Sequence, residues 1–288
     1  MMPSGKRLRY ALETLCAYMA YGIFRLLPLD TASAAGGWIG RHIGPLLPPT
    51  ETARQNLAMA FPEKSTEERE KIILGMWDNL GRVGAEYAHL HHIWERVTFD
   101  GKEILSTVQR SGKPAIFCGA HLANWEVCPI SAKKHGVDIS LVYRKPNNPG
   151  VDSLLRHARD SGAVEHIQKG AAGARGMLTV LKKNGVLGVL IDQKLNEGIP
   201  VPFFGRDAMT APALAHFALR FMCPVYPIRI ERLEGCRFKI TIYPALKTPS
   251  TSDQEKDTHE MLMEINRLLE SWIRERPEQW LWIHRRWG

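Results

Sequence analysis

A histidine and a carboxylate lie five positions apart in the segment His121-Leu-Ala-Asn-Trp-Glu126. The segment follows an apolar run, residues 115–118, which predicts a buried strand closed by Gly119. Both side chains are therefore expected at the carboxyl end of a strand, where open α/β sheets hold their active sites. A carboxylate bonded to one imidazole nitrogen leaves the other nitrogen free to take a proton from a hydroxyl. We predict that His121 is a general base and that Glu126 orients its ring.

The same spacing occurs a second time, between His259 and Glu264. Apolar residues around that pair recur with a helical period, and residues five apart on a helix point about 140° away from each other. We interpret this second pair as part of a solvated helix face. The alternative for His121 itself is a histidine that only bonds a backbone carbonyl at a turn.

Cys118, three residues before His121, offers a different mechanism in which a thiolate forms an acyl-enzyme. We favour a buried structural cysteine at this position. The five cysteines show no paired spacing, so neither a disulfide framework nor a zinc ribbon is indicated. A reducing, cytoplasm-facing location follows. The glycines at 170, 173 and 176 lack the spacing of a nucleotide-binding loop, and no cofactor is expected.

The chain is basic, with a formal net charge of +8 and an isoelectric point near 9.3. This charge favours an acidic partner, which can be nucleic acid, an anionic membrane surface or an acidic carrier protein. The sequence contains neither a zinc-finger spacing nor an RNA-binding signature. We therefore predict no nucleic-acid partner.

The first 30 residues combine a basic start with an apolar stretch. Lys6, Arg7 and Arg9 are followed by ten uninterrupted apolar or small residues, positions 15–24. Ten residues are too few to cross a bilayer, which needs about twenty. No small-residue cleavage site follows, which argues against a removed signal peptide. We predict a membrane-anchoring helix over residues 1–30 with its basic flank cytoplasmic, against the alternative of an ordinary core helix.

Residues 31–98 are expected to form a helical region packed on the core. Ser65 and Glu68 have the spacing of a capping box, which opens a helix. Glu86 and His89 have the offset used in di-iron carboxylate sites, but the sequence lacks the second such pair that those sites need. We therefore predict no metal site.

Residues 99–288 alternate between strand and helix patterns and are expected to form an α/β domain. The run 186–191 is apolar throughout and should lie inside the sheet, whereas 238–243 alternates and should face solvent on one side. The predicted fold class is α/β, with a mixed central sheet flanked by helices. The predicted strands cover residues 115–118, 139–143, 186–191, 225–230 and 238–243.

Several segments resemble one enzyme family in the same order along the chain. Together they are similar to the lipid A late acyltransferases, the lauroyl and myristoyl transferases of Gram-negative bacteria. The likeness covers most of the chain. The segments are residues 54–57, 61–63, 121–126, 143–148, 192–193, 201–205 and 277–287.

The resemblance implies a glycerol-3-phosphate acyltransferase-like fold at the cytoplasmic face of the inner membrane. It also implies acyl transfer from an acyl-carrier-protein thioester to a hydroxyl of a lipid A precursor, which is a phosphorylated glycolipid. Coenzyme A remains open as the carrier. Two other functions remain open: acyl transfer to another glycolipid of the phosphatidylinositol mannoside type, and a non-catalytic membrane-surface binding protein.

The resemblance adds Arg159 as a third catalytic residue, a donor to the negative charge on the thioester oxygen, against the alternative of a surface arginine. Arg144 closes the 139–143 strand and is predicted to grip a phosphate bidentately. Asp192, which ends the 186–191 strand, is grouped with the substrate-binding residues. We expect it to hold Arg144 or a backbone turn rather than to transfer protons. Asn124 and Trp125 complete the predicted substrate-binding set, with Trp125 lining an acyl-chain channel together with the apolar run 201–204.

Overall fold

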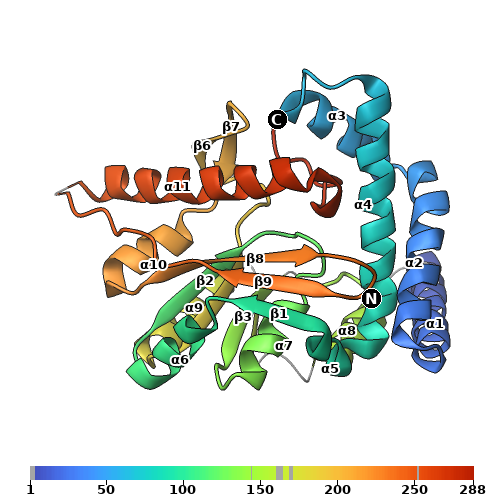
Figure 1. Cartoon of the computed structure of the whole chain (residues 1–288), viewed down its shortest axis with the longest axis horizontal. Helices are drawn as coiled ribbons and strands as arrows, with labels where there is room; N and C mark the ends of the chain where they lie inside the picture. The colour runs from blue at the N-terminus through green and yellow to red at the C-terminus, as the bar shows by residue number, and fades with distance from the viewer. Residues whose placement is uncertain (1–3, 144, 160–164, 169–170, 252) are drawn as a thin grey trace.

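A mixed sheet of seven strands forms the centre of the computed structural model, counted over residues 4–143, 145–159, 165–168, 171–251 and 253–288, which the structure describes. The strand order is β1-β9-β8-β2-β5-β3-β4 (Figure 1). A separate two-stranded hairpin pairs β6 with β7. The strands are β1 (Val97–Asp100), β2 (Ala115–Gly119), β3 (Ile139–Tyr143), β4 (Glu165–Gln168), β5 (Val186–Leu190), β6 (Ile199–Phe203), β7 (Arg206–Thr210), β8 (Val225–Arg232) and β9 (Phe238–Ile242).

The predicted α/β class and the five predicted strands are confirmed. The predicted interior run forms β5, between β2 and β3, and the alternating run forms β9, whose residues alternate between buried and half-buried. Four further strands, β1, β4, β6 and β7, were not predicted from the sequence. Two of them, β1 and β4, are short and half polar, and β6 carries two prolines, which weaken any strand signal.

Helices surround this sheet, and three of them pack together at one end of it. Figure 1 shows α4 standing at that end, with α1 and α2 on its outer side. The long helices are α1 (Ser4–Leu26), α2 (Leu29–Ile43), α3 (Pro49–Ala60), α4 (Thr66–Glu86), α6 (Lys102–Ser111), α7 (Val127–Lys134), α8 (Pro149–Arg159), α9 (Ala171–Lys182), α10 (Ala213–Phe221) and α11 (Gln254–Glu275). The shorter ones are α5 (Leu90–Ile93), η1 (Gly44–Leu46), η2 (Tyr87–His89), η3 (Trp94–Arg96) and η4 (Pro277–Gln279).

Helix α4 begins at the predicted capping box and crosses α2 at close range. The Ser65 hydroxyl accepts a hydrogen bond from the Glu68 amide, and the Glu68 carboxylate accepts one from the Ser65 amide. At the crossing, a Cβ on Gly36 would lie 2.4 Å from the carbonyl oxygen of Gly81. A Cβ on Gly81 would lie 2.1 Å from the carbonyl oxygen of Gly36. The two backbones are therefore in direct contact, and α2 and α4 pack as one unit.

The parallel register of β2 and β5 determines what lies beyond their ends. Gly119, the last residue of β2, pairs with Leu190, the last residue of β5. Two residues further along each chain come His121 and Asp192. Because the strands run in the same direction, these two side chains leave the sheet at the same edge.

The N-terminal helix α1 leaves a row of apolar side chains in solvent. Leu8, Leu12, Leu15, Met19 and Ile23 are each at least half exposed, and their spacing of three and four residues places them on one side of the helix. Over the described part of the chain, none of the helices has both the length and the apolar character required to cross a bilayer.

Candidate active site

His121 is held by a carboxylate on its δ nitrogen. Its Nδ1 lies 2.8 Å from Oδ1 of Asp192, and its backbone amide donates to Oδ2 of the same carboxylate at 3.0 Å. The indole Nε1 of Trp280 donates to Oδ2 at 2.7 Å. Since the carboxylate can only accept hydrogen bonds, the proton of the neutral imidazole lies on Nδ1, and the Nε2 nitrogen keeps its lone pair.

Asp192 is ionised in this environment. Burial opposes its charge, but the His121 ring and amide and the Trp280 indole outweigh burial and lower the pKa of Asp192 to about 2. The carboxylate is 3% exposed, behind the histidine. It therefore supports His121 rather than meeting a substrate directly. Asp192 accepts a bond from the His121 backbone amide, in line with one of the two roles expected for it, whereas its contact with the imidazole was not predicted.

Glu126 belongs to a different cluster. Its Oε2 accepts from Nε of Arg159 at 2.7 Å, and its Oε1 accepts from Nη2 of Arg159 at 2.5 Å. The Tyr87 hydroxyl donates to Oε1 at 2.6 Å, and the Trp125 indole donates to it at 3.0 Å. The prediction that Glu126 orients His121 is therefore wrong. The chain turns after His121, so Glu126 faces the end of α8, while the partner of His121 comes from the neighbouring strand.

The Glu126 cluster is charged as a unit. Burial opposes ionisation of Glu126, but Arg159, Tyr87 and Trp125 hold its pKa below the usual range. Burial likewise opposes the charge of Arg159, and Glu126 and Tyr87 raise its pKa nonetheless. Burial and the Glu126 charge raise the pKa of Tyr87 well above 10, so this phenol stays protonated and donates. The result is a fixed positive guanidinium beside a fixed carboxylate.

Both clusters open into one cavity of about 680 Å³, a size typical of small-molecule sites. His121, Glu126, Arg159 and Trp125 all line it, and the Trp125 ring meets the His121 ring edge to face at 5.0 Å. The amide nitrogen of Gln193 lies 3.4 Å from Nε2 of His121 and can donate a hydrogen bond to it. Apolar side chains form most of the remaining wall, among them Phe117, Leu141, Met177, Leu214 and Ile230.

The other predicted binding residues have different outcomes. Asn124 is fully buried, donates to Glu86 and accepts from the Glu126 amide, so the prediction that it binds substrate is wrong. Trp125 faces the cavity, where its role stays a prediction. Arg144 lies outside the described residues.

The C-terminal tryptophans are part of the core. Trp280, Trp282 and Trp287 are at most 6% exposed, and their rings pack with Phe203 and Phe204 at the end of β6. These three rings are therefore used in packing and are not exposed at the surface. The predicted apolar run 201–204 is likewise used mainly in this packing.

Sequence comparison adds the family. The family model described as bacterial lipid A biosynthesis acyltransferase matches residues 2–288. The chain belongs to this acyltransferase family. It is therefore an enzyme that transfers acyl groups.

Individual members of this acyltransferase family match most of the chain at low identity. The lipid A biosynthesis palmitoleoyltransferase of Escherichia coli (strain K12) is 27% identical over 275 residues, which cover 90% of this chain and 86% of the relative. The lipid A biosynthesis myristoyltransferase of the same organism is 25% identical over 248 residues, 79% of this chain and 72% of the relative. The lipid A biosynthesis lauroyltransferase is 26% identical over 246 residues, 81% and 76% respectively.

Cys118 is poorly suited to act as the nucleophile of this acyltransferase. It is 1% exposed in β2, and burial raises its pKa to about 12. A thiol nucleophile needs the opposite environment, a lowered pKa and access to the substrate. We expect Cys118→Ala to keep acyl transfer within about twofold of the unmodified enzyme, because no covalent step uses this sulfur. Steady-state transfer rates test this, and an acylated Cys118 peptide found by mass spectrometry would contradict it.

Proposed function

We propose that the enzyme transfers a fatty acyl chain from an acyl-carrier-protein thioester to a hydroxyl of a lipid A precursor, with His121 as the general base. The observation that carries this proposal is the His121–Asp192 pair at the wall of an apolar cavity, in a chain of this family. We further infer that the α/β domain has a glycerol-3-phosphate acyltransferase-like fold and begins near residue 99, after the helical region 31–98.

In the first half of the reaction, Nε2 of His121 takes the proton of the acceptor hydroxyl while that oxygen attacks the thioester carbonyl carbon. The imidazole becomes an imidazolium, which the Asp192 carboxylate stabilises through Nδ1 at 2.8 Å. In the second half, the carbon–sulfur bond breaks, and the leaving thiolate takes the proton from Nε2. The ester and the free carrier thiol are the products, and His121 returns to its neutral form.

Arg159 is our candidate for stabilising the negative charge on the thioester oxygen. Its side chain lies in the cavity wall, and both oxygens of Glu126 hold it in place. A donor whose position is fixed before the reaction needs no reorganisation when charge develops. In this proposal Glu126 and Tyr87 position the guanidinium.

The basic charge of the chain and the apolar cavity wall agree with the proposed substrates. A net charge of +8 attracts an acidic carrier protein and a phosphorylated lipid. The side chains of Phe117, Leu141 and Met177 offer apolar surface to a hydrocarbon chain.

The direct test incubates purified enzyme with acyl-carrier-protein thioesters of several chain lengths and a tetra-acyl disaccharide lipid, and measures the products by mass spectrometry. We expect one added acyl group on the lipid, with one donor length preferred. A parallel incubation with the matching coenzyme A thioesters identifies the carrier. The proposal fails if no donor adds a group to the lipid.

We also propose that α1 attaches the enzyme to the cytoplasmic face of the inner membrane while lying in the membrane surface. The support is the exposed apolar row from Leu8 to Ile23 next to the basic residues Lys6, Arg7 and Arg9. An amphipathic helix of this kind buries its apolar side among the lipid headgroups, and its basic residues bind anionic lipids.

The double variant Leu12→Glu/Met19→Glu tests this attachment. We expect its affinity for vesicles containing anionic lipid to fall about 100-fold, because two large apolar side chains no longer enter the interface. Vesicle co-sedimentation measures the change. Met222→Glu is the matched control, since Met222 is 87% exposed and lies at the end of α10, away from α1. We expect this variant to bind vesicles as well as the unmodified enzyme does. Equal binding by the double variant would show that α1 does not attach the enzyme.

A further inference from the structure

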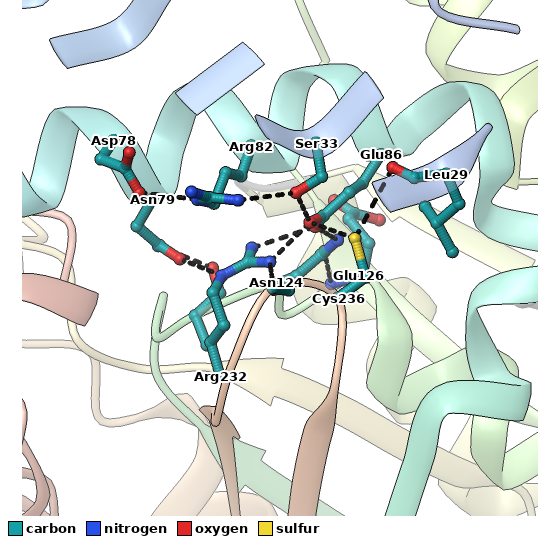
Figure 2. A network of polar contacts seen from close by, with 12 residues as sticks. Leu29, Ser33, Asp78, Asn79, Arg82, Glu86, Asn124, Glu126, Arg232 and Cys236 are labelled. Atoms are coloured by element: carbon teal, nitrogen blue, oxygen red, sulfur yellow. Dashed lines mark hydrogen bonds and ion pairs between the residues drawn. The ribbon is translucent and has the colours of Figure 1, made fainter. Parts of the chain in front are cut away.

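A buried ion pair lies behind the loop that carries His121 and Glu126. Glu86 ends α4 and is 0% exposed, and Arg232 ends β8 and is 7% exposed. Nη1 of Arg232 donates to Oε1 of Glu86 at 2.5 Å and Nη2 donates to Oε2 at 3.0 Å (Figure 2). A bidentate pair of this geometry fixes both the distance and the plane of its two partners. It joins the end of a helix to the end of a strand.

One series of hydrogen bonds connects the Glu86 carboxylate to the loop 121–126. Glu86 can only accept hydrogen bonds, so the amide group of Asn124 must turn its NH₂ toward it, at 2.8 Å. This leaves the Asn124 oxygen facing the other way, where it accepts from the backbone amide of Glu126 at 3.2 Å. The ion pair thus determines which side of Asn124 holds the loop.

A second series of hydrogen bonds connects the Arg232 guanidinium to the same loop. Arg232 can only donate, so the oxygen of Asn79 faces its Nε at 2.9 Å. The NH₂ of Asn79 is then free to donate to the carbonyl oxygen of Ala123 at 3.0 Å. Asn79 and Asn124 are therefore oriented in opposite senses by the two charges, and they hold the Ala123 carbonyl and the Glu126 amide of the loop.

The loop backbone that these hydrogen bonds hold is strained at Ala123. Ala123 has a φ of +46°, in the left-handed region that a residue with a Cβ adopts only when its surroundings impose it. Its amide donates to the carbonyl oxygen of Gln279 at 2.9 Å, while Asn79 binds its carbonyl. The Gln279 side chain in turn bonds the backbone amide and carbonyl of Arg232, each at 2.8 Å. The strained turn is fixed on both sides by groups anchored to the ion pair.

We propose that the Glu86–Arg232 pair, acting through Asn79 and Asn124, positions the loop so that His121 meets Asp192 and Glu126 meets Arg159 at the same time. Asn79, Glu86 and Arg232 are positioning residues in this assignment. The inference rests on the proposed function, in which both contacts serve acyl transfer. The left-handed turn at Ala123 lies between the two contacts, and its backbone amide and carbonyl are held from both sides.

Asn79→Asp tests the inference with almost no change in shape. One carboxylate oxygen still accepts from Arg232, but the donor to the Ala123 carbonyl is replaced by a second acceptor. We expect kcat to fall about 10- to 100-fold with KM changed less than about threefold, because a displacement of about 1 Å at the reacting groups costs rate more than binding. Steady-state kinetics measures this on folded protein that elutes as the unmodified enzyme does.

Asn266→Asp is the matched control. Asn266 is also buried in a helix and also donates to a backbone carbonyl, that of Pro202 at 3.1 Å, but it lies on α11 away from the loop. We expect this variant to lose comparable thermal stability and to keep kcat within about twofold. Equal kcat values for the two variants would overturn the positioning role.

A double-mutant cycle separates positioning from general damage. In a His121→Ala background we expect Asn79→Asp to cost clearly less activity than in the unmodified enzyme, since one of the two contacts that it positions is gone. An additive loss would mean that Asn79 acts elsewhere and would overturn the inference. If the unmodified enzyme transfers no acyl group from any donor, the proposed function fails, and this role fails with it. Transfer by the unmodified enzyme together with an unaffected Asn79→Asp variant refutes the positioning role alone.

Discussion

His121→Ala is expected to lower the rate of acyl transfer about 10²- to 10⁴-fold while the protein stays folded. The magnitude is the contribution of a well-placed general base. The side chain lies at the cavity wall and is 18% exposed, so its removal leaves only a small void. Rates measured with the mass-spectrometric transfer assay, and melting temperatures measured beside them, separate chemistry from folding.

His259→Ala is the natural control for His121→Ala. His259 is the other histidine that precedes a carboxylate by five residues, and it lies half-buried in α11. His259 does not line the cavity, so we expect acyl transfer by the His259→Ala variant to be unchanged. If His121→Ala transferred acyl groups as fast as this control, the general-base assignment would be untenable.

Asp192→Asn is expected to reduce transfer about 10²- to 10⁴-fold, the cost of fixing the wrong imidazole tautomer. The His121 amide and the Trp280 indole both donate to Oδ2, so the asparagine oxygen takes that place. Its NH₂ then faces Nδ1 of His121 and donates to it. The imidazole proton moves to Nε2, which can no longer accept the proton of the acceptor hydroxyl. Transfer kinetics of the variant measure this effect.

The same substitution should change the response of the fold to acid. A carboxylate whose pKa is lowered to about 2 in the folded state contributes stability above its ordinary pKa and loses that contribution as the pH falls toward 2. The lowering corresponds to about 2 kcal/mol at neutral pH. We therefore expect urea unfolding to give a difference between the two proteins that shrinks from about pH 4 to about pH 2. A difference that is constant over this range, or active Asp192→Asn enzyme, would contradict the role given to Asp192.

The position of His121 at the sheet edge could be predicted from the sequence because its main signal is local. An apolar strand followed by a glycine and a histidine was enough to place His121 at the carboxyl edge of the sheet. The Ser65 capping box and the apolar run of β5 were recognised for the same reason. Patterns of this kind depend only on neighbours along the chain.

The partner of His121 was missed because it depends on strand order. Glu126 is near His121 in the sequence, whereas Asp192 is 71 residues away and becomes adjacent only when β2 and β5 pair in parallel. The signal was present: both residues lie just beyond strands predicted to be buried. The pairing of Gly119 with Leu190 brings His121 and Asp192 together, but a single sequence does not show which strands are neighbours.

The Glu86–Arg232 pair was missed for a related reason. Apart from a weak metal-site spacing, the sequence around Glu86 indicates no function, and Arg232 belongs to no motif. Their contact spans 146 positions. Buried pairs of this kind carry no local pattern, and only the packed structure brings them together.

The contact between α2 and α4 has a consequence for the interpretation of inactivating mutations. Gly81 has no room for a methyl group against Gly36, and it lies two residues from Asn79 and five from Glu86 on the same helix. An alanine there would push the two helices apart and shift the residues that hold the loop 121–126. In a genetic screen such an allele would look like the loss of a reacting group, although its lesion lies at a helix crossing outside the cavity wall.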